Sequence, residues 1–158
     1  MNKQIKYVNI SWDQIDEYCN KISEDIKKMK ISFDMIVAVG RGGMIPARIL
    51  SDRLDVRNVQ LFSIRLYKGI TQRNTTPTVG SFSVDIQGKN ILLVDDILDS
   101  GITIETVINY MNSKRPVSVK TVTIMCKKSN KRKPTFFAEQ CEDDEWIVFP
   151  WERNETLK

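Results

Sequence analysis

Three carboxylates lie within five positions of this sequence, at Asp95, Asp96 and Asp99, and a small, partly polar run, Ser100-Gly101-Ile102-Thr103, follows them. Carboxylate oxygens accept hydrogen bonds from the vicinal hydroxyls of a ribose, and they also bind Mg²⁺. At the start of a helix, free backbone N–H groups and the positive dipole end bind anions, most often phosphate. The stretch therefore predicts a phosphate-binding loop beside a pair of carboxylates.

The flanking segments indicate how this loop is held. Before it, the unbroken apolar run Ile91–Val94 is typical of a strand buried on both faces of a parallel sheet. After it, Ile104–Met111 has apolar residues at helical spacing. Open α/β sheets bind their ligands at the carboxyl ends of the strands, so the acids and the loop stand where a site is expected.

A second strand, loop and helix occur earlier in the chain. Gly40-Arg41-Gly42-Gly43 follows the apolar run Met35–Val39 and precedes the helical pattern Met44–Leu50. Glycines allow positive φ and a close approach of the backbone to a ligand. We therefore predict an α/β fold with an open, mostly parallel twisted sheet flanked by helices. The remaining patterns predict a helix over Ser11–Met29, strands over Val59–Leu66, Ser81–Asp85 and Val117–Cys126, and a long loop over Tyr67–Gly80.

The segment Leu92–Thr103 resembles the signature of the type I phosphoribosyltransferases, which bind phosphoribosyl pyrophosphate (PRPP). The shared order is an apolar strand, two acids, two apolar residues, a variable position and a phosphate loop. The resemblance implies that Asp95 and Asp96 hold the ribose hydroxyls and Mg²⁺, the expected cofactor. It implies that the ribose and its 5-phosphate are also bound by Asp99, Ser100, Gly101, Ile102 and Thr103.

The glycine-rich loop resembles the pyrophosphate loop of the same family. The resemblance implies that Gly40, Arg41, Gly42 and Gly43 bind pyrophosphate, with a cis peptide bond between Gly40 and Arg41. It also implies that residues 67–80 form a flexible flap over the active site. From this flap, Lys68 and Arg73 are the candidates to reach the pyrophosphate.

The C-terminal part resembles that of the bacterial xanthine–guanine phosphoribosyltransferases, through the pattern Trp-Ile-x-x-Pro-Trp-acid, and the chain as a whole is most similar to the xanthine–guanine and hypoxanthine (6-oxopurine) phosphoribosyltransferases. This implies that Trp146 and Ile147 sandwich a purine ring and that Lys127 donates to its O6 atom. Asp99 would be the catalytic residue that takes the proton from purine N7, with burial strengthening its basicity. Val148 stands where this family has an acid, which leaves the preference at the purine 2-position open.

These resemblances imply an enzyme of purine salvage. It would transfer the 5-phosphoribosyl group from PRPP to guanine, xanthine or hypoxanthine, releasing pyrophosphate and forming the nucleoside monophosphate. One alternative is a non-catalytic module of the same fold that senses PRPP or nucleotides, in which the basic run Lys127–Lys133 contacts nucleic acid. Another is transfer to a pyrimidine or orotate, which the two tryptophans around Pro150 disfavour.

The composition of the chain limits the type of catalysis, the cellular compartment and the partners that are expected. The chain has 158 residues, a net charge of +4, no histidine and three widely spaced cysteines. The lack of histidine excludes a His-based triad, and the cysteine spacing indicates reduced thiols in a cytoplasmic protein. No apolar run is long enough for a membrane span, and we expect no membrane partner and no nucleic acid. We expect a homo-oligomer, as is usual in this family.

The length predicts a single domain covering residues 1–158. Within it we expect a core over about 30–127, the flap over about 67–80, and a small C-terminal hood with the base pocket over about 128–158.

Overall fold

The computed structural model describes residues 5–68, 75–80 and 82–156. Its centre is a sheet of five strands in the order β3-β2-β6-β7-β8, and every neighbouring pair is parallel. The strands are β2 (Met35–Val39), β3 (Val59–Phe62), β6 (Asn90–Leu98), β7 (Ser118–Lys127) and β8 (Phe136–Cys141). The predicted α/β fold with a mostly parallel sheet is therefore confirmed.

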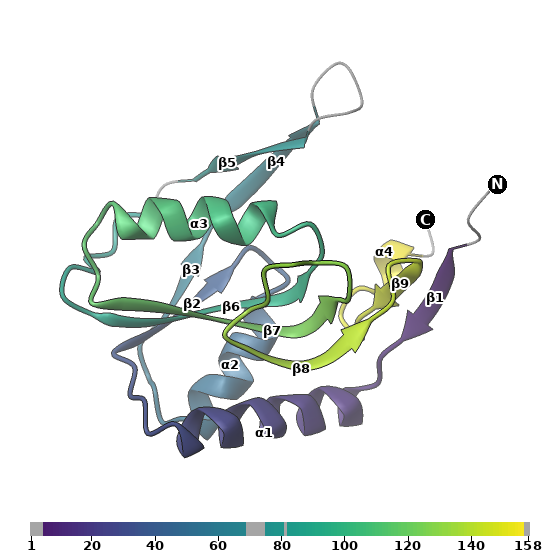
Figure 1. The fold of residues 1–158 in the computed structure, drawn as a ribbon, viewed down its shortest axis with the longest axis horizontal. Helices are drawn as coiled ribbons and strands as arrows, with labels where there is room; N and C mark the ends of the chain where they lie inside the picture. Colours follow the sequence, from purple (N-terminus) through teal and green to yellow (C-terminus); the bar gives the residue numbers. More distant parts are fainter. Residues whose placement is uncertain (1–4, 69–74, 81, 157–158) are drawn as a thin grey trace.

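Helices cover both faces of this sheet (Figure 1). Helices α1 (Trp12–Lys28) and α2 (Met44–Arg53) lie on one face, and α3 (Ile102–Asn112) lies on the other. Alternate residues of each strand divide between the two layers: Ile36 packs with α1 and α2, whereas Val37 packs with α3. Among the described residues, no helix combines the length and the apolarity that a bilayer span requires.

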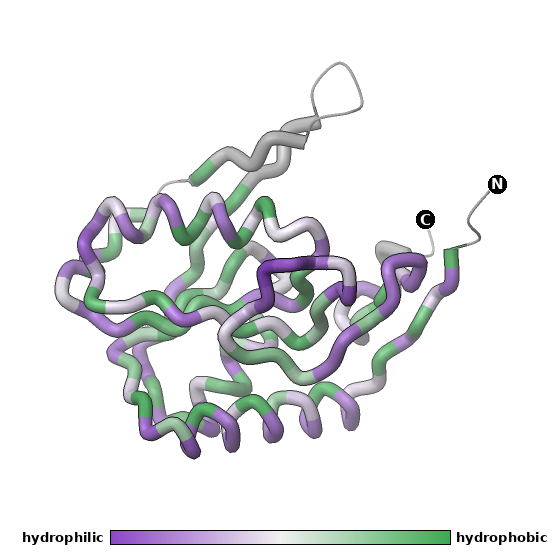
Figure 2. Tube along the Cα trace, in the orientation of Figure 1, coloured by the Kyte–Doolittle hydropathy of each residue, from purple (hydrophilic) through white to green (hydrophobic). Residues whose placement is uncertain are grey.

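Helix α1 shows why its sequence folds as predicted. Ser11 forms a capping box with Gln14, because its Oγ accepts from the Gln14 N–H at 3.1 Å and Gln14 Oε1 accepts from the Ser11 N–H at 2.9 Å. Hydrophobic and hydrophilic residues alternate along this helix, as one face packs on the sheet (Figure 2). Trp12, expected within the apolar face, is instead 53% exposed and packs its ring against Trp151, with centroids 5.8 Å apart.

The hood contains the N-terminal strand as well as the C-terminal residues. Strand β1 (Lys6–Asn9) pairs in parallel with β9 (Glu145–Val148), and α4 (Arg153–Thr156) follows. The two ends of the chain consequently lie at the same end of the molecule (Figure 1). The sequence patterns had indicated no partner for residues 6–9.

The region between β3 and β6 differs from the expectation. The single strand expected over Val59–Leu66 is two strands, because the chain leaves the central sheet after the buried Phe62. Strand β4 (Ile64–Lys68) then pairs in antiparallel fashion with β5 (Thr75–Val79), and the Ser63 carbonyl accepts from the Gly80 N–H at 2.9 Å. The long loop expected over residues 67–80 is therefore wrong at residues 67–68, where β4 ends, and at residues 75–79, where β5 forms.

The edge strand expected over residues 81–85 is also wrong for its described part, residues 82–85. Phe82 is buried instead and packs its ring on Phe62, with centroids 5.0 Å apart. The Tyr110 hydroxyl of α3 donates to the Phe82 carbonyl at 3.1 Å. These contacts hold the segment against α3 rather than along a sheet edge.

Candidate active site

The candidate site lies where three neighbouring parallel strands end. Strand β2 leads into Gly40–Gly43, β6 carries Asp95 and Asp96 and leads into the phosphate loop, and β7 ends at Lys127. Because β2, β6 and β7 are adjacent and parallel, their carboxyl ends share one edge of the sheet. The fold thus brings the glycine-rich loop, the two carboxylates with the phosphate loop, and Lys127 to one edge of the sheet.

The glycine-rich loop packs directly against the end of β6. A Cβ atom on Gly42 would lie 2.3 Å from Asp96 Oδ2, and one on Gly43 would lie 2.2 Å from the Val94 carbonyl oxygen. Position 43 has no room for a side chain, because the atoms it would meet belong to the backbone, whereas a Cβ at position 42 would require the Asp96 carboxylate to move. Glycine at both positions lets the two loops share the sheet edge without either change.

The peptide geometry of this loop differs from the expectation. The described residues contain no cis peptide bond, so the cis bond expected between Gly40 and Arg41 is wrong. Gly40 instead adopts φ +53°, in the left-handed region that glycine enters without strain. Its N–H donates to the Phe62 carbonyl at 2.9 Å, which sets the direction of the turn.

Asp95 and Asp96 lie within β6 rather than after it, so the strand is longer than the expected Ile91–Val94 run. Both are buried, at 9% and 8% exposure. Burial raises the pKa of Asp95 well above its usual value, and the neighbouring Asp96 charge raises it further. Burial also raises the pKa of Asp96, although the hydrogen bond that its Oδ1 accepts from the Ile97 N–H, at 2.7 Å, opposes this.

The predicted phosphate loop leads into α3 and leaves the start of that helix open. Gly101 is the N-cap residue, with φ +83° and no side chain to cap the first turn. The Ser100 Oγ accepts from the Ile102 N–H, but at 3.4 Å this hydrogen bond is long and weak. The first-turn N–H groups of α3, including that of Thr103, therefore form an electropositive end suited to a phosphate.

The sequence analysis missed Asn130, which holds this loop from the hydrophilic connection between β7 and β8 (Figure 2). Its Nδ2 donates to the Asp99 carbonyl at 2.8 Å and would lie 3.3 Å from a Cβ on Gly101. Its Oδ1 accepts from the Arg132 N–H at 3.1 Å. Arg132 also pairs with Glu105 in the first turn of α3.

A pocket of about 420 Å³ lies between the phosphate loop and the hood. It brings together Asp99, Lys127, Trp146 and Ile147, the predicted catalytic and base-binding residues, with Asp96. Further lining residues, which sequence reasoning did not select for this role, are Ile5, Asp143, Asp144, Glu145 and Glu152. The unbroken acidic run Glu142–Glu145 was a visible signal for some of them.

Exposure separates the pocket residues. Asp99 is exposed, so the burial expected to strengthen its basicity is absent. Trp146 is 56% exposed and offers a ring face to a ligand, whereas Ile147 is buried, with 7% of its surface exposed. Behind them, the Phe149 and Trp151 rings stack with centroids 5.0 Å apart.

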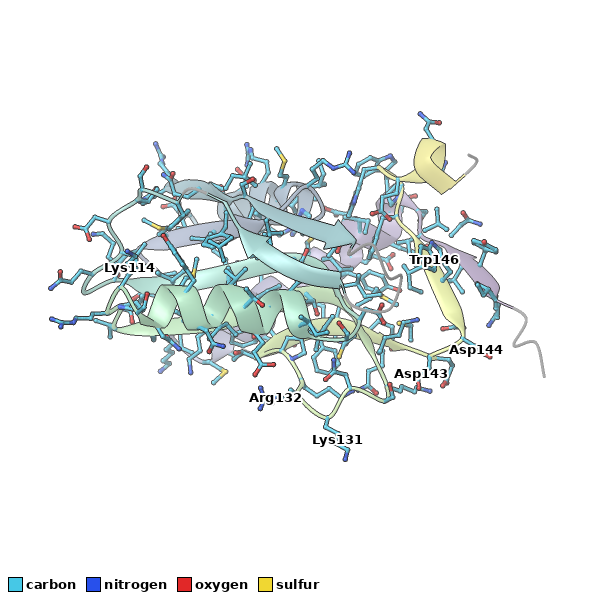
Figure 3. All side chains as sticks on the ribbon, turned by 90° about the horizontal axis from the view of Figure 1, so that it is seen from above. Lys114, Lys131, Arg132, Asp143, Asp144 and Trp146 are labelled. Atoms are coloured by element: carbon cyan, nitrogen blue, oxygen red, sulfur yellow. The ribbon has the colours of Figure 1, made fainter. Side chains whose placement is uncertain are left out.

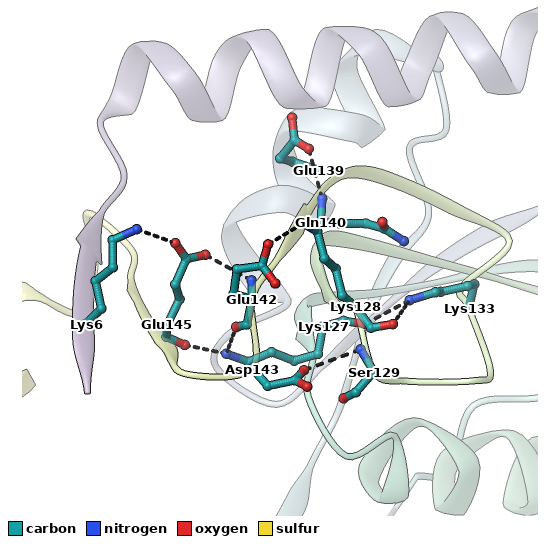
Figure 4. Close-up of polar contacts among 10 residues, drawn as sticks. All are labelled: Lys6, Lys127, Lys128, Ser129, Lys133, Glu139, Gln140, Glu142, Asp143 and Glu145. Carbon is teal, nitrogen blue, oxygen red and sulfur yellow. Dashed lines mark hydrogen bonds and ion pairs between the residues drawn. The ribbon is translucent and has the colours of Figure 1, made fainter. Parts of the chain in front are cut away.

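Lys127 is 7% exposed, and its ammonium group holds the hood turn (Figure 4). Its Nζ donates to the Glu142 carbonyl at 2.9 Å and also to the Glu145 carbonyl. An ammonium group has three N–H donors, so these two bonds leave one for a ligand.

Two residues predicted to bind pyrophosphate are placed only in part. Lys68 is the last residue of β4, and Arg73 lies outside the described residues. Within the described part of the chain, no three Cys, Asp or Glu side chains are grouped so that they could hold a metal by themselves. Asp95 and Asp96 supply hard oxygen ligands, which suit a Mg²⁺ ion whose other ligands come from a substrate and water.

Comparison with known proteins places most of this chain in one family. The family described as "Phosphoribosyl transferase domain" matches residues 2–155. Xanthine-guanine phosphoribosyltransferase of Ruegeria sp. is 32% identical, with 93% of this chain and 86% of that protein covered. The same enzyme of Idiomarina loihiensis is 27% identical, with 90% and 85% covered. The crystal structure of a purine phosphoribosyltransferase from Pyrococcus horikoshii superposes with a TM-score of 0.81 at 28% identity, covering 93% of this chain and 94% of that one.

The glycine contacts predict a clear difference between two matched substitutions. Gly43→Ala should lower the free energy of unfolding by about 2 kcal/mol, because its Cβ meets the backbone atoms Val94 O and Val39 N. Gly42→Ala should cost less than about 1 kcal/mol, because it meets the end of the Asp96 side chain, which can rotate. Urea unfolding of both variants measures the difference. Equal losses would contradict this packing.

The raised pKa of Asp95 predicts how stability depends on pH. A raised folded-state pKa means that the folded chain binds the proton more tightly, so stability falls as the pH rises from the unfolded to the folded pKa. Asp95→Asn should therefore increase the free energy of unfolding at neutral pH, and this gain should vanish as the pH falls below the usual carboxyl range. Urea unfolding over a pH series measures it. A gain that is independent of pH would argue against the ionised carboxyl as its cause.

Proposed function

Because the chain belongs to the phosphoribosyl transferase domain family, we propose that it is a purine phosphoribosyltransferase of purine salvage. It transfers the 5-phosphoribosyl group from PRPP to a 6-oxopurine and releases pyrophosphate. One observation carries this proposal: Asp99, Lys127 and Trp146 line a single pocket beside the open start of α3. The names of the relatives from Ruegeria sp. and Idiomarina loihiensis support the same reaction.

PRPP binds along the carboxyl edge of the sheet. The N–H groups of Ser100–Thr103 and the hydroxyls of Ser100 and Thr103 hold the 5-phosphate at the start of α3. Asp95 and Asp96 accept from the ribose hydroxyls. Because both have raised pKa values when PRPP is absent, a nearby cation would favour their ionised forms.

The pyrophosphate group lies over the glycine-rich loop. Gly40–Gly43 offers backbone N–H groups with no side chain to obstruct the approach, and Arg41 adds a positive charge. Lys68 and Arg73 complete this subsite from the flap. Mg²⁺ held by Asp95, Asp96 and the oxygens of PRPP would stabilise the negative charge of the leaving group.

The purine lies in the pocket under the hood. Trp146 and Ile147 pack against the ring, and the remaining N–H of Lys127 donates to O6. This donor opposes adenine, which has an amino group at the same position. Asp99 accepts the N7 proton while the purine nitrogen attacks C1 of the ribose.

Features outside the pocket bear on location and assembly. All three cysteines are buried and unpaired, which supports a cytoplasmic, reducing environment. Val59 and Leu61 are exposed on the edge strand β3, which favours a homo-oligomer, a dimer or tetramer, that covers them. We propose that one domain spans residues 1–158, with its core over about 30–127, its flap over about 67–80 and its hood over about 128–158.

The alternative of a regulatory module that binds nucleic acid finds less support. In the basic segment, Lys128 pairs with Glu142 and Arg132 pairs with Glu105. Lys133 donates to the carbonyls of Lys127 and Lys128 at 2.8 and 3.1 Å. Because these cations bind groups of the protein itself, less of their positive charge is available to the phosphates of a nucleic acid.

Pyrophosphate release tests the reaction. Chain, PRPP and Mg²⁺ are mixed with hypoxanthine, guanine, xanthine, adenine or orotate, one at a time, and release is expected only with the 6-oxopurines. Asp99→Asn should lower kcat by about 100-fold and leave the KM for PRPP nearly unchanged, because asparagine keeps the backbone N–H and a side-chain oxygen that can contact PRPP but cannot take the N7 proton. Asp55→Asn is the matched control, because Asp55 lies between α2 and β3, at the amino ends of the strands and away from the site. PRPP binding without release for any acceptor would favour the regulatory module.

Asn130 tests the support of the phosphate loop. Asn130→Ala should raise the KM for PRPP about threefold to tenfold, because it removes the bond to the Asp99 carbonyl, whereas the KM for the purine should change little. Lys131→Ala, in the same connection (Figure 3), is the control, and Asn130→Gln should restore part of the loss. Initial-rate kinetics separate the two KM values. An equal rise in both would contradict a specific role at the phosphate loop.

A further inference from the structure

We propose that the purine pocket of this chain prefers guanine and discriminates against xanthine, because its wall is strongly acidic; this inference rests on the proposed purine transfer. Among the described residues that line the pocket, Lys127 is the one basic side chain. Six carboxylates line it as well: Asp96, Asp99, Asp143, Asp144, Glu145 and Glu152.

The acidic run Glu142–Glu145 is held at the pocket by specific contacts (Figure 4). Lys127 binds the carbonyls of Glu142 and Glu145, which are the two ends of the turn. Asp143 accepts from the Ser129 N–H at 3.3 Å. The Asp144 carbonyl accepts from the Lys6 N–H at 3.0 Å, so β1 fixes this residue through its backbone.

The charge of Glu145 is partly balanced by Lys6. Lys6 Nζ lies 2.7 Å from Glu145 Oε1, and this hydrogen bond lowers the pKa of Glu145. Glu145 is therefore ionised, with its charge offset by a residue of β1. Asp143 and Asp144 are exposed and lie close to Trp146 at the hood end of the molecule, far from Lys114 (Figure 3). Their field acts on any base that packs against Trp146.

The chemistry of the three 6-oxopurines then decides the order. Guanine is neutral and presents two kinds of donor, N1–H and the 2-amino group, whereas hypoxanthine presents N1–H alone on that side. Xanthine carries a carbonyl at C2 and loses a proton near neutral pH, so it becomes an anion. Ionised carboxylates only accept hydrogen bonds, and they repel an anion. Lys127 donates to O6 in every case, and its single positive charge, which attracts the xanthine anion, is outnumbered by the carboxylates of the wall.

Val148 sharpens this inference. It follows Trp146 and Ile147 directly, is only 3% exposed and is not among the residues that line the pocket. The position therefore contributes no charge to the pocket. The acids before Trp146, with Glu152 after Trp151, are what set the charge that the purine 2-position meets.

Two kinds of measurement test the proposal at low ionic strength and slightly alkaline pH, where xanthine is largely ionised. The first is kcat/KM for guanine, hypoxanthine and xanthine with PRPP at saturation. The second is the affinity of the free chain for GMP, IMP and XMP by calorimetry, which does not depend on turnover. We expect xanthine and XMP to be worse than guanine and GMP by at least about tenfold, with hypoxanthine and IMP between them.

Charge variants identify the cause. Asp144→Lys should reduce the guanine-to-xanthine ratio by at least about threefold, and Asp144→Asn should reduce it less, because the first reverses the charge that the second only removes. Asp55→Asn makes the same charge change on an exposed residue with φ +51°, which asparagine tolerates, at the other edge of the sheet. It should leave the ratio unchanged.

The outcomes separate this inference from the proposed function. Equal use of xanthine and guanine, or a ratio that Asp144→Lys does not change, would overturn the inference and leave the enzyme intact. If no purine is turned over but GMP binds much more tightly than XMP, the proposed enzymatic function would be overturned and the proposed selection by charge would be supported.

Discussion

The site depends on the contact between the glycine-rich loop and the end of β6. Gly43 lies so close to the Val94 carbonyl that a Cβ would overlap it, and Gly42 lies so close to the Asp96 carboxylate that a Cβ would displace it. This contact seats two strand–loop–helix units on one sheet edge. The start of α3, the carboxylates and the glycine-rich loop consequently share one edge of the sheet, along which we propose that a ligand with two phosphate-bearing ends binds.

That arrangement has a cost in the folded protein without ligand. Asp95 and Asp96 are buried side by side; burial raises the pKa of both carboxyls, and the charge of Asp96 raises that of Asp95 further. Ribose hydroxyls and a Mg²⁺ ion would compensate both, because each interacts best with ionised carboxylates. The unfavourable electrostatics of these two residues are thus what a substrate would relieve.

The hood depends on a different set of interactions. Lys127 at the end of β7 binds the turn before β9, and β1 adds a second strand and the Lys6 ion pair to it. Trp12 of α1 packs on Trp151, which stacks on Phe149 behind the pocket. The pocket wall is therefore assembled from both ends of the chain, and its charge comes from a turn that these contacts hold in place.

The sequence by itself determined four of the five central strands, the three long helices and the two loops at the sheet edge, because each is encoded by the order and spacing of neighbouring residues; strand β8 (Phe136–Cys141) was not predicted. Only the tertiary structure decided how Lys6 meets Glu145, 139 positions away, and how Asn130 reaches Asp99. It also decided that Asp95 is buried while Asp99 is exposed, and that residues 75–79 form a strand. These features depend on contacts between segments far apart in the chain, which no local pattern of residue types specifies.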